Sequence, residues 1–167
     1  MYPAGNLIKL APSDLSASAH TAGDVVFTKA ELKNAVPSRG GCSLLVGMSV
    51  FVEGAADDDD FTFMFFDNDT ALGEPSNDPG SDITADEFRA ASCIGSIRFD
   101  GTKSTAVGNG LLYNLDSGVT GGGRTPVFVK SEAEKTSIWV ACISHAGTLD
   151  LTDTDSMTLT FGFQYLG

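Results

Sequence analysis

The sequence predicts an all-β protein, a two-sheet antiparallel sandwich of jelly-roll type with one short helix. Roughly eight to ten short segments alternate apolar and polar residues, as strands do, and turn residues separate them. The 19 glycines suit a fold with many turns. Alternating helices and strands are missing from the pattern, which disfavours a parallel α/β sheet.

Residues 60–69, Asp-Phe-Thr-Phe-Met-Phe-Phe-Asp-Asn-Asp, hold four of the eleven Phe residues of the chain. With a period of two, both sides of this strand are largely apolar. We expect it in the middle of a sheet, with one face on the core and the other covered by a second layer or a partner chain. The two sides are Phe61, Phe63 and Phe65, and Thr62, Met64 and Phe66.

The other strand candidates follow from the same alternation. We expect residues 43–54 and 60–67 to pair as a β-hairpin across a longer acidic connection. In the first of these, Leu44, Val46 and Met48 fall on one side and Leu45 and Gly47 on the other. The remaining candidates are residues 7–10, 24–33, 92–99, 103–107, 110–115, 126–130, 136–145 and 157–166.

The sequence predicts the start of one helix. Thr84-Ala85-Asp86-Glu87 has the spacing of a capping box, in which the Thr84 hydroxyl and the Glu87 carboxylate bond each other's backbone amides. It predicts a short helix over residues 85–91.

Length and charge bound the class of protein. The 167 residues suffice for one domain without a metal or disulfide, here residues 19–167, preceded by residues 1–18 as an N-terminal arm or first edge strand. The net charge of −12 disfavours nucleic acid and anionic membranes as partners. Cys42, Cys93 and Cys142 form no C-x-x-C pair and are expected to be free thiols. The start of the chain lacks a signal-peptide pattern, so we expect synthesis in a cytoplasm.

Acidic clusters raise the question of metal binding. Asp57–Asp60 is expected to be a solvated turn, with a Ca²⁺ site shared with Asp67 or Asp69 as the alternative. Neither residues 67–69 nor the Asp-rich residues 150–155 have the spacing of an EF-hand loop. We therefore expect no metal and no cofactor.

The pattern contains no catalytic signature. The two histidines are His20 and His145; on one strand, Cys142 and Ser144 share a face and His145 lies on the other. The expectation is a structural or binding protein and not an enzyme. Glycan stacking stays open for four aromatic residues: Tyr2, Tyr113, Trp139 and Tyr165.

A family resemblance rests on short motifs in a fixed order. They are Thr21-Ala22-Gly23-Asp24-Val25-Val26, Gly40-Gly41, Phe65-Phe66-Asp67-Asn68, residues 91–97, Ser137-Ile138-Trp139-Val140-Ala141 and Leu159-Thr160-Phe161-Gly162-Phe163. In this order, over about residues 14–162, the chain resembles the small cement or decoration proteins of tailed-bacteriophage capsids. The loops 68–82 and 116–124 have no counterpart in the resemblance.

The resemblance implies a structural protein on the outer capsid surface of the virion, bound to the major capsid protein between its subunits and self-associating as a dimer or trimer. Residues 1–18 and 68–82, irregular and proline-bearing, are expected to reach neighbours, and deleting 1–18 is expected to weaken attachment without changing the melting of the fold. The alternative is a tail-associated or receptor- or glycan-binding sandwich. The candidate contact residues are Tyr2, Pro3, Leu7, Phe66, Pro75 and Pro79.

Overall fold

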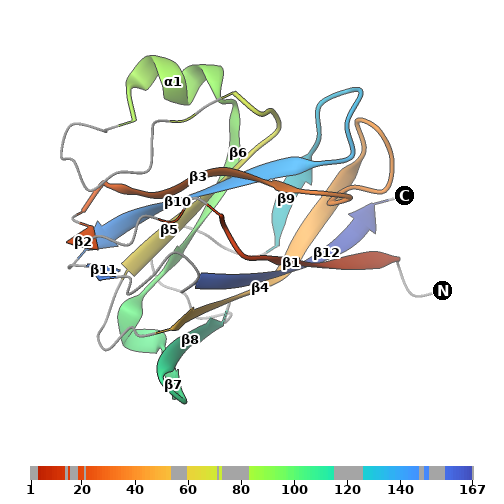
Figure 1. Ribbon diagram of the computed structural model, residues 1–167. Coiled ribbons are helices and arrows are strands. Elements are labelled where there is room, and N and C mark those ends of the chain that lie inside the picture. Colours follow the sequence, from red (N-terminus) through yellow and green to blue (C-terminus); the bar gives the residue numbers. More distant parts are fainter. Residues whose placement is uncertain are drawn as a thin grey trace.

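Two antiparallel sheets packed together, with one short helix, make up the computed structural model of the chain (Figure 1). The structure describes residues 4–13, 15, 19–20, 22–53, 60–70, 72, 83–114, 126–146, 149–150 and 157–166. The predicted fold class, an antiparallel β-sandwich with one short helix, is confirmed.

The six-stranded sheet forms one layer. Its order is β1-β12-β4-β8-β7, and β9 pairs with the first part of β4. The strands are β1 (Gly5–Leu10), β12 (Met157–Leu166), β4 (Cys42–Glu53), β8 (Gly110–Asn114), β7 (Thr105–Val107) and β9 (Val127–Lys130).

The four-stranded sheet forms the other layer, in the order β3-β10-β5-β6, and α1 (Ala85–Ala90) lies on its outer side (Figure 1). Its strands are β3 (Val25–Leu32), β10 (Ile138–Ala146), β5 (Asp60–Phe66) and β6 (Cys93–Phe99). A 3₁₀ turn, η1 (Gly101–Lys103), follows β6. The pair β2 (Ala19–His20) and β11 (Leu149–Asp150) was not predicted, because two residues are too few to show a period.

The phenylalanine-rich strand β5 lies in the middle of its sheet, as predicted. It pairs with β10 on one side and with β6 on the other. Phe61, Phe63 and Phe65 are fully buried between the sheets. Edge-to-face contacts join β5 to the opposite sheet, from Phe61 to Tyr113 with ring centroids 5.4 Å apart and from Phe65 to Phe161 at 6.2 Å. Such geometry adds to the hydrophobic gain of burial.

The predicted hairpin of residues 43–54 with 60–67 is wrong. β4 pairs with β12, β8 and β9, whereas β5 pairs with β10 and β6 in the other sheet. Alternation tells which side of a strand is apolar, but it is the same whether the chain turns back or crosses over. Six connecting residues reach roughly 20 Å, twice the spacing of ~10 Å between packed sheets, so the crossing is geometrically allowed.

A β-bulge in β4 changes which residues face the core. The pairing of β12 with β4 shifts between Gly162 and Phe163, so Val46 is the extra residue. Leu45 and Met48 are both buried, while Val46 is 47% exposed. The uninterrupted alternation expected for this strand is therefore wrong before the bulge and right after it.

The N-terminal strand is an integral edge of the six-stranded sheet. All six residues of β1 pair with β12, and the amide of Tyr165 donates to the carbonyl of Ala4 at 2.9 Å. Leu15 is also buried in the core. Removing residues 1–18 would therefore strip a paired strand, which contradicts the expectation that this deletion leaves the melting of the fold unchanged.

The helix begins as the capping box predicts. The Thr84 hydroxyl accepts from the Glu87 amide at 3.2 Å, and a Glu87 carboxylate oxygen accepts from the Thr84 amide at 2.8 Å. The Glu87 carboxylate also accepts from the Thr84 hydroxyl at 2.7 Å, and this bond, together with the one from the Thr84 amide, lowers the pKa of Glu87. The helix ends at Ala90, one residue before the predicted end.

The three cysteines are free, as expected. Cys142 is fully buried, and desolvation raises its thiol pKa well above the usual value. Across the described ranges, no helix is both long and apolar enough to cross a membrane.

The burial of β5 gives a stability prediction. Phe65→Ala should lower the free energy of unfolding by about 3–5 kcal/mol, because it empties a closed site between the sheets. Phe128→Ala is the matched control, since Phe128 is 53% exposed, and it should cost less than about 1 kcal/mol. Urea denaturation followed by Trp139 fluorescence measures both values, and equal losses would contradict the assigned core.

Candidate functional site

The outer face of the six-stranded sheet carries an exposed apolar surface. Helix α1 lies on the far side of the other sheet and leaves this face open (Figure 1). Five large side chains on it are exposed: Val107 (46%) at the β7 edge, and the group of Leu7 (65%), Phe128 (53%), Val46 (47%) and Leu166 (36%). Half-buried Leu44 pairs with Phe128 and Gln164 and so lies between β9 and β12. We call Leu7, Leu44, Val46, Phe128 and Leu166 the apolar face.

Two glycines leave bare backbone in the centre of the apolar face. Gly162 pairs with Gly47 on one side and with Leu7 on the other. A Cβ atom on Gly47 would meet no atom within 4 Å, and one on Gly162 would meet only backbone at 3.7 Å or more. A larger residue would therefore fit at either position. With glycine there, a side chain of another molecule can approach the backbone of β4 and β12.

The charge of this face differs from that of the whole chain. Among the strand residues of the six-stranded sheet, the charged side chains on the outer face are Lys9, Lys130 and Glu53. Glu53 lies at the end of β4, where it accepts a hydrogen bond from Asn109 at 2.8 Å. Although the net charge of the chain is −12, the described strand residues of this sheet place one carboxylate, that of Glu53, on the outer face.

Of the six candidate contact residues, the structure gives a position to two. Leu7 is part of the apolar face. Phe66 is fully buried in the chain's own second core, with Met64, Leu72, Ala91, Trp139 and Ala141. Phe66 therefore cannot contact a partner directly, and the outer side of β5 gives no reason to expect self-association. Tyr2, Pro3, Pro75 and Pro79 lie outside the described residues, as does most of the loop 68–82.

Sequence reasoning missed the other members of the apolar face. Phe128 lies between half-buried Val127 and buried Val129, and Leu166 follows half-buried Tyr165, so the apolar alternation that contains them was present in the printed sequence. This signal does not predict exposure, because a strand with two apolar sides has the same sequence pattern whether its outer side is exposed or covered by a second layer. For Leu44 and Val46 the bulge also hid the side on which they lie.

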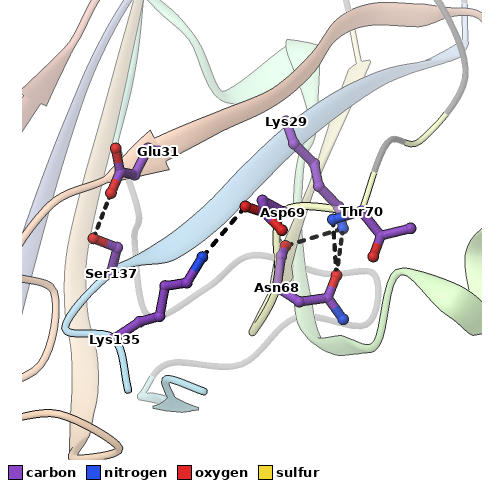
Figure 2. A network of polar contacts seen from close by, with 7 residues as sticks. All are labelled: Lys29, Glu31, Asn68, Asp69, Thr70, Lys135 and Ser137. Atoms are coloured by element: carbon purple, nitrogen blue, oxygen red, sulfur yellow. Dashed lines mark hydrogen bonds and ion pairs between the residues drawn. The ribbon is translucent and has the colours of Figure 1, made fainter. Parts of the chain in front are cut away.

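A polar network closes the outer side of the four-stranded sheet (Figure 2). The ammonium group of Lys29, on β3, contacts the carbonyl of Asn68 at 3.2 Å, its Oδ1 at 3.3 Å and the carbonyl of Ala91 at 3.2 Å. It also lies 4.2 Å from the centroid of the Phe66 ring. Burial lowers the Lys29 pKa to about 8, against the opposing effects of Asp67, Asp69 and Cys93.

A second lysine extends this network. Lys135 pairs with Asp69 at 3.3 Å and lies 5.1 Å from the centroid of the Trp139 ring. On the same face, Ser137 donates to Glu31 at 2.7 Å (Figure 2). Lys29 of β3 and Lys135, in the connection between β9 and β10, thus hold the start of the segment that follows β5.

The separation of His145 from Cys142 and Ser144 expected from the sequence is confirmed. Cys142 and Ser144 are buried, whereas His145 is exposed, which is the arrangement that strand alternation predicts. Tyr113 and Trp139 are also buried, so neither presents a ring for glycan stacking. The hydroxyl of Tyr165 donates to the carbonyl of Asn34 at 3.0 Å.

The structure describes one end of the acidic run. Asp60 pairs with Arg98 at 2.5 Å and accepts from the amide of Gly101 at 2.8 Å. Its carboxylate already has cationic and backbone partners, which weakens the case for a Ca²⁺ site at this end of the run. Asp57–Asp59 lie outside the described residues. Within the described ranges, no three His, Cys, Asp or Glu side chains converge as metal ligands would.

The Asp60 pair gives a second stability prediction. Asp60→Asn should lower the free energy of unfolding by about 2 kcal/mol, because the partly buried Arg98 loses a charged hydrogen-bond partner. Asp86→Asn is the control, since the Asp86–Arg89 pair has a similar 2.6 Å contact but is exposed, and it should cost less than about 1 kcal/mol. Denaturation at pH 7 measures both, and a smaller loss for Asp60→Asn than for Asp86→Asn would refute the assignment.

No family model matches this chain, and a search of curated proteins finds no match.

Proposed function

We propose that the chain is a structural virion protein, a capsid cement or decoration protein that binds the major capsid shell through the apolar face. The observation that carries the proposal is the exposed apolar surface of Leu7, Val46, Phe128 and Leu166, on a sheet face whose described strand residues include a single carboxylate. The family resemblance noted in the sequence supplies the kind of partner. The geometry supplies the surface.

The size of the face suits a protein partner. The 40 strand residues of this sheet, at ~3.4 Å along a strand and ~4.8 Å between strands, give roughly 650 Å² of sheet face. A stable protein–protein interface buries about 800 Å² on each partner, so this face supplies most of one side of such an interface. Repetition over a capsid lattice adds to the durability of attachment.

The charge pattern favours the same surface. Carboxylates elsewhere on the chain keep it dispersed, while the outer face has Lys9 and Lys130 beside its apolar side chains. A partner surface that is apolar with acidic groups at its rim would complement it. The buried position of Phe66 removes that residue as a contact, so the apolar face takes its place in the proposal.

The test is binding to capsids of the encoding virus assembled without this chain. Wild-type protein should sediment with them, and Phe128→Glu should lower the affinity at least tenfold because it forces a carboxylate into the interface. Ser96→Glu is the matched control, because Ser96 is exposed on the outer face of the other sheet and should bind as wild type.

Three results would count against the proposal. Wild-type protein that stays in the supernatant excludes the cement function. If Phe128→Glu and wild type bind capsids equally well, the capsid contact lies on a surface other than the apolar face. Light scattering that shows a dimer dissociated by Phe128→Glu assigns the apolar face to a second copy of the chain.

A further inference from the structure

The hydrogen bond between Lys29 and Asn68 brings an amine against a carboxamide. Lys29 belongs to β3, and Asn68 follows β5, so the two side chains meet across β10 on the outer side of the sheet (Figure 2). The Lys29 nitrogen is 3.3 Å from the Oδ1 atom of Asn68. The centroid of the Phe66 ring is 4.2 Å from this nitrogen, so an apolar ring covers one side of it.

The Asn68 amide is held at both of its polar atoms. Its Oδ1 also accepts a hydrogen bond from the amide of Thr70 at 3.1 Å, and its Nδ2 donates to the carbonyl of Ala90 at 3.3 Å. A donor fixed on a carbonyl oxygen stabilises the negative charge that develops there when a nucleophile adds to the carbon. The side-chain carbon of Asn68 is thus both oriented and activated.

A proton acceptor lies beside the pair. Oδ1 of Asp67 is buried and has no hydrogen-bond partner. Asp67 is the leading charge that acts on Lys29, ahead of Asp69 and Cys93. A buried carboxylate oxygen without a donor is costly. Asp67 acts on Lys29 through its charge and forms no ion pair with it, so it can take the amine proton after its side chain turns toward the nitrogen or through one bridging water.

Burial supplies the reactive form of the lysine. Desolvation lowers the Lys29 pKa to about 8, so roughly a tenth of the amines are neutral at pH 7. A neutral lysine amine is a nucleophile, whereas an ammonium is not. This small fraction is sufficient for a single, irreversible event in the life of the chain.

We propose that Lys29 and Asn68 join in an intramolecular isopeptide bond, with Asp67 as the proton carrier. The Lys29 nitrogen adds to the Asn68 side-chain carbon, and its proton passes to Asp67. Asp67 then gives this proton to Nδ2, the carbon–Nδ2 bond breaks, and ammonia leaves. One amine and one primary amide become one secondary amide and one ammonia, without any oxidant or cofactor.

The bond would fasten the sheet across its width. Lys29 and Asn68 lie 39 positions apart, and their strands flank β10 on both sides. A covalent link over a loop of this length restricts the unfolded chain, as a disulfide does. Unlike a disulfide, an amide persists in a reducing compartment.

Intact-mass spectrometry of the denatured full-length protein is the test. Wild type should be lighter than its sequence by one molecule of ammonia, and a digest should contain one branched peptide that joins Lys29 to Asn68. Lys29→Arg and Asn68→Ala should each have the full sequence mass. Asp67→Asn should also keep the full mass, or lose ammonia at least tenfold more slowly.

Succinimide formation at Asn109-Gly110 also releases ammonia and needs a control. Lys29→Arg separates the two reactions, because it removes the isopeptide bond and leaves Asn109 intact. A wild-type protein of full mass overturns the proposal, as does an ammonia loss that persists in Lys29→Arg. A mature wild type should melt roughly 10 °C above Lys29→Arg, which is the effect of a cross-link of this length.

Discussion

The architecture depends on one constraint, the need to cover both sides of β5. Its inward phenylalanines meet aromatic rings of the opposite sheet, and its outward Met64 and Phe66 would otherwise lie in water. Burying each such side chain contributes roughly 1.5–3 kcal/mol, so the outer pair matters as much as the inner rows. The chain meets this constraint with a second small core beneath α1 and Leu72.

The layer that covers the second side of β5 partly buries polar groups, among them the side chains of Lys29 and Asn68. The six-residue helix buries none of its own residues, so it cannot be held by apolar packing of its turns alone. Lys29 bonds the carbonyl of Ala91 at its end, and Asn68 bonds that of Ala90. Lys29 and Asn68 therefore lie together because they close the same layer, and the proposed isopeptide bond depends on this proximity.

The same arrangement leaves the other sheet bare. With the helix on one side of the sandwich, the outer face of the six-stranded sheet keeps Leu7, Val46 and Phe128 exposed. The bulge at Val46 and the pair Gly47–Gly162 make this face uneven and open at the backbone. The proposal of a capsid-binding protein depends on this face, and the proposed cross-link on the opposite one, so each can fail without the other.

The sequence by itself determined the class of fold, the strand β5, the capping box of α1 and the separation of Cys142 and Ser144 from His145. These features follow from local alternation and local hydrogen bonds, which a short stretch of sequence contains in full. Only the tertiary structure decided that β4 and β5 lie in different sheets, that Phe66 is covered by its own chain, and that Lys29 meets Asn68. Those outcomes depend on which strands pair over long distances, and alternation is the same for every pairing that keeps the apolar side inward.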